Sequence, residues 1–381
     1  MDTTGIILLE HGPGGQPAAF SAPRAVVVAR HADDVAPSLA RLDAARAAGQ
    51  WIAGWIGYEA GLALEPKLAR LMPEGGAPLL AFGIYDAPGD AAALLDQASA
   101  QAAGAGLQGL RPQVSRADYG AAFDRVAEYI RAGDCYQINL TFPMQARLTG
   151  SPLGLYGALR ARQSVGFGAY LDLGAGPVVV SRSPELFFAT DAAGRIRARP
   201  MKGTAPRGAD PEEDAGLAAE LYESEKARAE NLMIVDLLRN DISRLARVGS
   251  VRVPELFKVD SFATVHQMSS TVVGDLVDPP ALTGLMTALH PCGSITGAPK
   301  IRAMEIIAEV EPHPRGVYCG AIGWMGPDGA SAFSVAIRTL SITGDRVVLN
   351  VGGGVVHDST AQGEWEEAHW KARYASILNR D

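Results

Sequence analysis

The chain has 381 residues, of which 48% are hydrophobic and 20% are charged, and its formal net charge is −8. This composition is typical of a globular protein with room for roughly two or three domains. The negative charge argues against nucleic acid as the main partner, although a local basic pocket could still bind a small anion. No apolar run is long enough to span a bilayer, so we expect no membrane partner.

Cysteine content and the N-terminus indicate the compartment. The N-terminus lacks the basic start and the long apolar core of a signal peptide. The three cysteines, Cys135, Cys292 and Cys319, have a spacing that fits neither a disulfide framework nor a zinc site. We therefore expect a cytoplasmic protein. The 43 glycines and 24 prolines indicate many turns and hence many strands.

Residues 1–113 are predicted to form an N-terminal part. Helical spacing occurs at Val35–Ala48, and apolar runs of strand length occur at Gly5–Glu10, Ala25–Ala29 and Trp51–Glu59. Residues 86–113 are rich in Ala, Gly and Pro, which favours a linker whose Ala-rich middle could still be helical.

Residues 114–381 are predicted to form a second, catalytic domain. Ser115 caps an amphipathic helix that Gly133 closes, and a meander of short strands follows. Ser224–Arg247 has the spacing of a long helix, and a closing helix begins at about Ala361, after a glycine turn at Gly352–Gly354. Strands and helices interleave without strict alternation, which favours an α+β fold over a doubly wound sheet.

Lys202 is the candidate reactive residue. It lies in the stretch Arg199–Gly208, where prolines fix φ and glycines permit backbone geometries that other residues resist. A lysine in such surroundings is expected on a constrained loop. Taken alone, the stretch could equally be a surface turn with basic residues, so the rest of the chain has to decide.

Two predicted helices carry carboxylates that could share a divalent cation. On the last helix, Glu364, Glu367 and Lys371 share one face. On the long helix, Glu230 stands beside an apolar run, where a carboxylate needs a partner. Mg²⁺ prefers one or two carboxylates plus substrate oxygens, so it could be shared between the helices. The alternatives are an intrahelical ion pair on the last helix and a salt bridge from Glu230 to an arginine.

Two glycine-rich motifs do not match the nucleotide-binding patterns that they resemble. In Gly293–Lys300 the second glycine is not followed directly by Lys-Ser/Thr as in a P-loop, but the motif can present Thr296 and backbone N–H groups to an anion. Gly352–Gly354 lacks the spaced dinucleotide fingerprint and a βαβ unit. It is better interpreted as a place where a ligand lies close to the backbone.

Five motifs in a fixed order resemble those of a known family: Ser181–Glu185, Pro200–Gly208, Ala229–Leu237, Gly293–Lys300 and Gly352–Lys371. The chain resembles the chorismate-utilising enzymes, which include anthranilate synthase, the isochorismate and salicylate synthases, and aminodeoxychorismate synthase component I. The resemblance covers roughly residues 115–380. It implies an α+β fold with a large mixed, mostly antiparallel β-sheet core of two packed sheets and helices on the outside.

Within this family, the chain looks most like aminodeoxychorismate synthase component I. Lys202 stands where anthranilate synthases carry alanine, and Gln137 stands where the water-using isochorismate and salicylate enzymes carry a lysine base. The implied reaction joins ammonia to chorismate and gives 4-amino-4-deoxychorismate for para-aminobenzoate and folate biosynthesis. Ala227 departs from the family pattern, which usually has an acidic residue there.

The resemblance also implies a role for each matching residue. Lys202 would attack C2 of chorismate, and protonated Glu185 would assist departure of the C4 hydroxide before ammonia attacks C4. Mg²⁺ would hold the ring carboxylate through Glu230 and Glu367, with Glu364 close by. The residues implied to contact the substrate are Tyr318 and Arg338, which would clamp the pyruvyl carboxylate, and Gln137, Thr204, His266, Thr296, Gly353 and Lys371.

The implied partner is a separate glutaminase subunit. None of the cysteines lies in a Gly-x-Cys-x-Gly elbow, so glutamine-derived ammonia would have to come from another chain. Two other functions stay open. The chain could be an anthranilate synthase component I in which Lys202 takes no part, or a non-catalytic subunit that only binds and activates a glutaminase.

Overall fold

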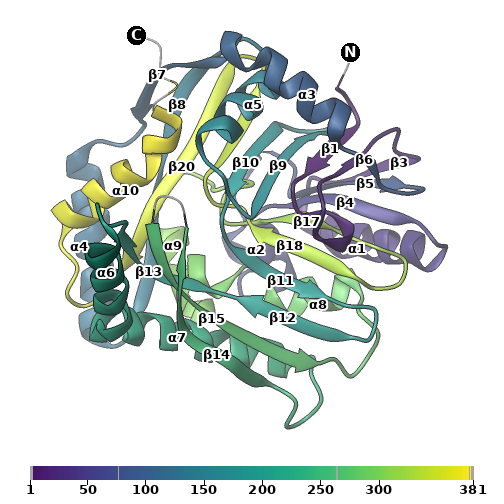
Figure 1. Ribbon diagram of the computed structural model, residues 1–381. Coiled ribbons are helices and arrows are strands. Elements are labelled where there is room, and N and C mark those ends of the chain that lie inside the picture. The colour runs from purple at the N-terminus through teal and green to yellow at the C-terminus, as the bar shows by residue number, and fades with distance from the viewer. Residues whose placement is uncertain (1–2, 76, 263–264, 377, 379–381) are drawn as a thin grey trace.

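The architecture is two large antiparallel sheets with helices around them (Figure 1). The computed structural model describes residues 3–75, 77–262, 265–376 and 378. Within these ranges each sheet has ten strands, and neighbouring strands run antiparallel. The expected α+β fold with a mostly antiparallel core is therefore confirmed. None of the helices in these ranges is both long and apolar enough to cross a membrane.

The first sheet combines the N-terminal strands with the long C-terminal strand. Its strands, in spatial order, are β16 (Gly297–Ala298), β8 (Gln137–Thr149), β20 (Arg346–Val355), β19 (Thr339–Thr343), β10 (Val178–Ser183), β9 (Phe167–Asp172), β1 (Ile6–Leu9), β2 (Ala18–Phe20) and β6 (Gly89–Asp90), with β7 (Gly106–Pro112) paired to β8.

The second sheet carries the Lys202 stretch at one edge. Its strands, in spatial order, are β13 (Met201–Pro206), β15 (Val265–Asp275), β12 (Arg195–Arg199), β11 (Leu186–Thr190), β18 (Ser331–Val335), β17 (Ala321–Met325), β4 (Trp51–Ile56), β5 (Leu80–Tyr85) and β3 (Ala25–Ala29), with β14 (Arg252–Ser261) paired to β15.

Helices cover the outside of the sheets. Figure 1 shows the last helix, in yellow, lying along β20. The helices are α1 (Ala32–Ala47), α2 (Ala60–Leu64), α3 (Ala92–Gln101), α4 (Arg116–Ala132), α5 (Pro152–Arg162), α6 (Pro211–Glu223), α7 (Glu225–Ser243), α8 (Leu282–Leu289), α9 (Lys300–Val310) and α10 (Ala361–Ser376), with short 3₁₀ turns η1 (Pro13–Gly15), η2 (Ala69–Leu71), η3 (Ala102–Gly104) and η4 (Gly293–Ile295).

The two sheets pack against each other through apolar side chains. One buried cluster joins Phe20 and Leu171 of the first sheet to Trp55 and Tyr85 of the second. The rings of Phe20 and Tyr85 are 5.3 Å apart between centroids, which is direct aromatic contact. The two sheets therefore share one apolar interface.

The N-terminal part is built into both sheets. Residues 1–113 supply β1, β2, β6 and β7 to the first sheet and β3, β4 and β5 to the second. The stretch 86–113 contains α3, the helix that its Ala-rich middle allowed, but its last part forms the paired strand β7 where a linker was expected. The helix α3 packs closely on α5: a Cβ at Gly157 would lie 2.1 Å from the carbonyl oxygen of Ala98. The small residues that suggested a linker serve this close packing instead.

Two local predictions about the backbone need correction. Gly352–Gly354 is not a turn, because β20 continues through it and pairs with β8 as far as Val355. Lys202 lies on the edge strand β13 and not on a loop, although the pairing with β15 shifts register between Met201 and Thr204. Glycine and proline patterns suit turns and irregular strands alike, so the sequence could not separate the two.

Candidate active site

The end of β20 is where the predicted site residues meet. A Cβ placed on Gly354 would lie 3.3 Å from Nζ of Lys202 and 3.1 Å from Cδ of Gln137. The register of β8 with β20 brings Gln137 beside this strand end, and β13 approaches from the second sheet. Glycine is needed here because any side chain would fill the space between the lysine and the amide.

The neighbouring glycine faces the last helix. A Cβ on Gly353 would lie 2.6 Å from Oε2 of Glu364, 3.4 Å from Oε1 of Glu367 and 3.5 Å from Nζ of Lys371. Lys371 also donates to the carbonyl oxygen of Gly352 at 2.9 Å, which fastens α10 to β20. Two adjacent glycines thus bring together residues from β8, β13 and α10.

Lys202 has the surroundings of a reactive amine. The left-handed φ of +86° at Gly203 belongs to the register shift that turns β13 at this point. Among the described residues, no acceptor lies within hydrogen-bonding distance of Nζ of Lys202. Burial lowers the pKa of this amine, while the carboxylates of Glu230 and Glu185 oppose that shift. The environment therefore favours the uncharged, nucleophilic form more than water does.

Glu185 has the opposite perturbation, which suits an acid. It lies in the short connection between β10 and β11 and is 5% exposed. Burial raises its pKa to about 7, against the hydrogen bond from Ser294 and the positive charge of Lys202. The Ser294 hydroxyl donates to Oε1 at 2.8 Å, and the backbone N–H of Met201 also donates to the carboxyl. The carboxyl is thus held beside the residue that precedes Lys202 and is partly protonated near neutral pH.

Gln137 offers a buried amide without a protein partner. Its side chain is fully buried, and neither Oε1 nor Nε2 has a hydrogen-bond partner in the described part of the chain. A buried amide left unpaired costs free energy, so its atoms are suited to a ligand that supplies the missing bonds. The position next to Lys202 places that ligand in the candidate site.

Three carboxylates were predicted to hold Mg²⁺, and two of them lie on α10. Glu364 is buried, and Oε1 accepts a hydrogen bond of 2.6 Å from Ser359, while Oε2 has no partner among the described residues. Glu367 forms an ion pair of 2.7 Å with Lys371, the intrahelical arrangement that the sequence left open. Glu230 on α7 is partly buried, and its nearest cation is Lys226 at 4.0 Å, so within the described ranges the alternative of an arginine salt bridge is not observed.

These carboxylates fit a cation that is completed by substrate. Glu230 and Glu367 both act electrostatically on Lys202, which places them around the same space. Among the described residues, no group of three or more His, Cys, Asp or Glu side chains is close enough to form a full protein cage. Mg²⁺ commonly binds through one or two carboxylates plus ligand oxygens, and the orphan oxygen of Glu364 is a further donor of the right kind.

The chain segments that carry Tyr318 and Arg338 run alongside each other. The Cys319 N–H donates to the Ala336 carbonyl at 2.9 Å, which brings the chain at Tyr318 alongside the chain that leads to Arg338. Arg338 has a left-handed φ of +50°, and within the described ranges no acceptor contacts its guanidinium. Burial lowers the pKa of Arg338. An unpaired, desolvated guanidinium is a natural site for a carboxylate.

The two threonines predicted in the site differ in their surroundings. Thr296 is fully buried at the end of η4, and its hydroxyl donates to the carbonyl oxygen of Cys292 at 3.1 Å. The adjacent strand β16 pairs with β8 at Gln137, so Thr296 lies beside the site. Thr204, in contrast, is exposed on the edge strand β13.

His266 does not match the expected contact with the substrate ring. Its ring is buried, with Nδ1 bonded to Ser261 Oγ and Nε2 bonded to Asp214 Oδ1, both at 2.9 Å. Arg207 donates two hydrogen bonds to the same Asp214 carboxylate. Both ring nitrogens are occupied by protein, so we assign His266 to the support of β15 and α6. The sequence could not show this, because Asp214 lies far from it along the chain.

Ala227 is explained by packing. It stands at the start of α7 in a small apolar cluster with Leu221 and Met268, directly beneath β13. A Cβ on Gly203 would lie 2.9 Å from the Cβ of Ala227, so helix and strand touch here. Alanine supplies no carboxylate at this position. The carboxylates around Lys202 therefore come from Glu230 on α7 and Glu367 on α10.

Two serines near the site had no role in the predictions. Ser294 bonds Glu185, and Ser359 bonds Glu364. Ser294 lies inside the Gly293–Lys300 motif. The motif therefore marked the segment as functional, but it did not reveal that Ser294 bonds Glu185. Ser359 stands in the segment before α10, where nothing in the local pattern singles it out.

The chain is similar to proteins of one known family. Residues 5–376 match the family model described as chorismate binding enzyme. The chain is 45% identical to aminodeoxychorismate synthase component 1 of Escherichia coli K12 over 254 residues, which are 67% of this chain and 56% of that protein. It is 41% identical to the Klebsiella aerogenes protein of the same name over 334 residues, 82% of this chain and 74% of that protein.

Anthranilate synthases are similar as well. Component 1 from Thermus thermophilus is 43% identical over 259 residues, 68% of this chain and 56% of that protein. The crystal structure of anthranilate synthase component I from Streptococcus pneumoniae superposes with a TM-score of 0.79 at 25% identity, covering 99% of this chain and 93% of that one. The chain spans little more than half the length of several of these relatives. With a family match over nearly its whole length, the chain belongs to the chorismate binding enzymes.

Proposed function

We propose that this protein converts chorismate and ammonia into 4-amino-4-deoxychorismate. The observation that carries the proposal is that Lys202 and Glu185 act on each other electrostatically and have opposite pKa shifts. Burial lowers the pKa of the amine and raises the pKa of the acid to about 7. An uncharged amine next to a protonated carboxyl is what nucleophilic attack with acid-assisted loss of hydroxide requires.

In the first step, the lone pair of Lys202 Nζ forms a bond to C2 of chorismate. Both ring double bonds shift, C1=C2 becoming C1=C6 and C5=C6 becoming C4=C5, and the C4–O bond breaks. Glu185 gives its proton to the departing hydroxide, which leaves as water. The enzyme then carries the substrate as a secondary ammonium on Lys202, and Glu185 is a carboxylate.

In the second step, ammonia attacks C4, both ring double bonds shift back, and the C2–N bond to Lys202 breaks. The lysine leaves as a neutral amine, and the new ammonium at C4 can return a proton to Glu185. The sum is chorismate plus ammonia giving 4-amino-4-deoxychorismate plus water. Gln137, whose amide atoms are unpaired beside Lys202 in the described part of the chain, is suited to hydrogen-bond the incoming nitrogen.

The remaining residues bind and orient the substrate. Arg338 and Tyr318 would hold the pyruvyl carboxylate, since Arg338 is desolvated and has no acceptor among the described residues. Glu230 and Glu367, with Glu364 close by, would hold Mg²⁺, which when bound would offset the charge of the ring carboxylate. Lys371 neutralises Glu367 at 2.7 Å.

The ammonia would come from a glutaminase subunit. This part of the proposal rests on the absence of a cysteine elbow in the sequence and on the similarity to proteins named component 1. All three cysteines are buried free thiols, and burial raises the pKa of Cys292 to about 12, which makes it a poor nucleophile. A cytoplasmic location stays a prediction.

Product identification tests the proposal. The purified protein is incubated with chorismate, Mg²⁺ and an ammonium salt, and the products are separated by chromatography with fluorescence and mass detection. We expect 4-amino-4-deoxychorismate. Accumulation of fluorescent anthranilate would instead establish the second candidate, an anthranilate synthase component I, which the 43% identity to the Thermus protein supports. No turnover of chorismate at any ammonium concentration would favour a non-catalytic subunit.

A further inference from the structure

Glu185 stands at the end of a row of three buried side chains. Oγ of Ser294 lies 2.8 Å from Oε1 of Glu185 and 3.3 Å from Sγ of Cys292. All three residues are 5% exposed or less, so water does not compete for these contacts. Within the described residues, Ser294 is the only side chain that hydrogen-bonds this carboxyl group. The serine therefore determines what one of the two carboxyl oxygens can do.

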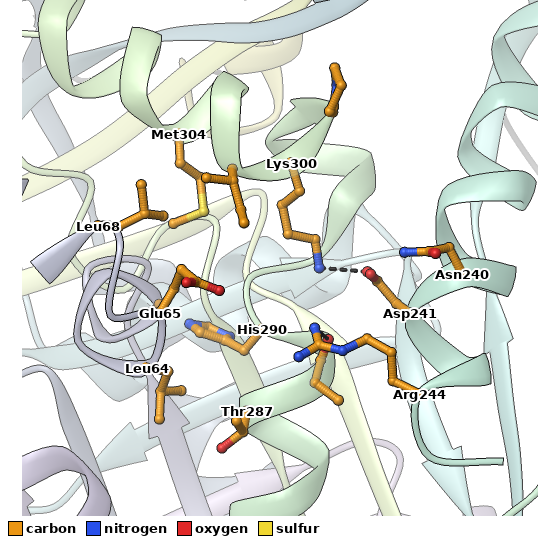
Figure 2. Close-up of a pocket in the computed structure, with 14 residues that line it drawn as sticks. Leu64, Glu65, Leu68, Asn240, Asp241, Arg244, Thr287, His290, Lys300 and Met304 are labelled. Carbon is orange, nitrogen blue, oxygen red and sulfur yellow. Dashed lines mark hydrogen bonds and ion pairs between the residues drawn. The ribbon is translucent and has the colours of Figure 1, made fainter.

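The turn that carries Ser294 is anchored on both sides. Within the turn η4, the Thr296 hydroxyl donates to the Cys292 carbonyl at 3.1 Å. In the helix that follows, Lys300 Nζ lies 2.5 Å from Oδ2 of Asp241. Figure 2 shows these two side chains pointing toward each other from α9 and α7. The Ser294 hydroxyl is therefore presented from a fixed backbone.

The backbone of Glu185 is anchored as well. Its N–H donates to Oγ of Ser183 at 3.3 Å, and its carbonyl oxygen accepts the N–H of Val335 at 3.1 Å. The carboxyl group can therefore change direction only by rotation about the bonds of its own side chain. The hydrogen bond from Ser294 restricts that rotation, in the way that a supporting residue holds a reacting group.

The number of hydrogens available sets the direction of these bonds. A hydroxyl carries one hydrogen, and a thiol is a weak donor and a weak acceptor. Burial raises the pKa of Cys292 to about 12, so its thiol keeps its hydrogen at neutral pH. The hydroxyl of Ser294 donates to Oε1 of Glu185, its stronger acceptor, and the Cys292 thiol donates to Oγ of Ser294.

This direction decides which oxygen of protonated Glu185 carries the proton. A proton on Oε1 would force the Ser294 hydroxyl to turn toward the sulfur of Cys292, which is a weaker acceptor. A proton on Oε2 leaves Oε1 as the carbonyl oxygen and keeps the bond from the serine. The second placement is therefore favoured, and Oε2 is the oxygen that Ser294 leaves free.

We propose that Ser294 is a positioning residue that keeps the acid proton of Glu185 on Oε2. This inference rests on the proposed function, in which Glu185 gives that proton to the hydroxide leaving C4. As the C4–O bond breaks, the proton passes from Oε2 to the leaving oxygen, and the negative charge stays on the carboxyl group. The Ser294 hydroxyl stabilises that charge at Oε1 and itself neither gains nor loses a proton.

Two titratable side chains of the described residues act on the Glu185 carboxyl group. They are Lys202 from β13 and Cys292 from the segment before η4. The backbone N–H of Met201 also donates to the carboxyl. Substitution of Ser294 leaves all three groups in place, so a change in the titration of Glu185 can be assigned to the lost hydroxyl.

Infrared difference spectroscopy of the full-length protein without chorismate tests the position of the proton. The band to follow is the carboxylic acid C=O band that is present in the wild type and missing in Glu185→Gln. In Ser294→Ala we expect this band at higher wavenumber, because the carbonyl oxygen has lost its hydrogen bond. The pH midpoint of the band should rise by about one unit, because the lost bond had stabilised the carboxylate. An unchanged band overturns the proposal.

Cys292→Ala is the matched control. It removes a buried side chain beside the same turn and leaves the bond between Ser294 and Glu185 in place. The Glu185 band should therefore keep its wild-type position and midpoint. Equal shifts in Cys292→Ala and Ser294→Ala would assign the effect to altered packing and overturn the proposal. If thermal unfolding shows that Ser294→Ala is not folded, Ser294→Cys replaces it, with shifts of the same sign and smaller size because a thiol is a weaker donor.

The pH dependence of turnover connects the band to the reaction. In Ser294→Ala the alkaline fall of the rate should move to higher pH by the same amount as the infrared midpoint. A wild-type rate in Glu185→Gln would remove the acid step from the proposed function and overturn this inference with it. A strongly impaired Glu185→Gln, together with a Ser294→Ala variant whose band and alkaline fall stay in place, would overturn this inference alone.

Discussion

Two lysines in glycine- and proline-rich motifs behave differently in this molecule. Lys300 opens α9 and is bonded to Asp241 at 2.5 Å and to a backbone carbonyl at 2.9 Å. Lys202 on β13 has no acceptor within hydrogen-bonding distance in the described residues, and burial lowers its pKa. In the sequence, both lysines have glycine and proline neighbours. The structure separates an amine that holds two helices together from an amine that is left reactive.

The acids beside these lysines show the same contrast. Burial raises the pKa of both Asp241 and Glu185. Asp241 has a direct ammonium partner, whereas Glu185 has a serine hydroxyl and a backbone N–H, with Lys202 acting only through its charge. A buried acid with a cation in contact is a structural pair, and a buried acid with neutral donors is free to carry a proton.

Loss of Lys202 is expected to have the largest effect. Lys202→Ala should lower formation of 4-amino-4-deoxychorismate by about 10³-fold or more, because no other group is placed to attack C2. Lys202→Arg should do no better, since guanidinium keeps its proton. Folding should be retained, because the amine has no hydrogen bond to lose within the described residues. Chromatographic product assays and thermal unfolding measure the two effects.

Two observations on the same pair of proteins complete this test. Wild-type enzyme given chorismate without ammonia should show, by mass spectrometry, a covalent adduct on the peptide that contains Lys202. In the alanine variant, ammonia could reach C2 and give traces of the anthranilate precursor. A wild-type rate in Lys202→Ala would show that Lys202 is not the nucleophile and is only a basic residue on an edge strand.

Glu185→Gln should reduce turnover by about 10²–10⁴-fold, the usual contribution of a general acid. The wild-type rate should be bell-shaped in pH. On the alkaline side it falls as Glu185, with a pKa of about 7, loses its proton, and on the acid side it falls as Lys202 becomes protonated. The residual rate of the variant should lack the alkaline fall. An unchanged alkaline limb in Glu185→Gln would assign that limb to another group.

Glu367→Gln should lower turnover by about 100-fold at limiting Mg²⁺ and shift the Mg²⁺ requirement upward. Direct binding of Mn²⁺, followed by electron paramagnetic resonance, should weaken in the same variant, which gives a readout independent of catalysis. Glu366→Gln is the matched control, since this neighbour is exposed on the same helix. If the melting temperature changes and the metal titration does not, Glu367 serves only its ion pair with Lys371.

Lys300→Met should mainly affect stability. It leaves the buried carboxylate of Asp241 unpaired, which we expect to lower the free energy of unfolding by about 3–5 kcal/mol. The double variant Lys300→Met/Asp241→Leu should recover most of that loss, because no uncompensated charge remains. Urea unfolding measures both. A larger loss of catalysis than of stability would contradict the contrast between the two lysines.

The sequence by itself determined the local elements and the identity of the reactive groups. Ser115 and Gly133 define the ends of α4, with the Ser115 hydroxyl accepting a bond from Asp118 and Gly133 in the left-handed region. Helical spacing alone places Glu364, Glu367 and Lys371 on one face. These features were predictable because caps and periodicity act within a few residues along the chain. The family motifs added Lys202 and Glu185 through resemblance, not through local physics.

Only the tertiary structure decided what those groups can do. The sequence of Gly352–Gly354 is compatible with either a turn or a strand. It forms a strand because β8 pairs with it, and α10 side chains occupy the space that a Cβ would need at Gly353. His266 reads as a possible ligand contact until Asp214, from α6, occupies its ring. Whether a lysine is paired or reactive depends on partners from other elements. Contacts between residues far apart in the sequence determine how deeply a charged group is buried and which group compensates its charge. A local sequence pattern cannot predict these contacts.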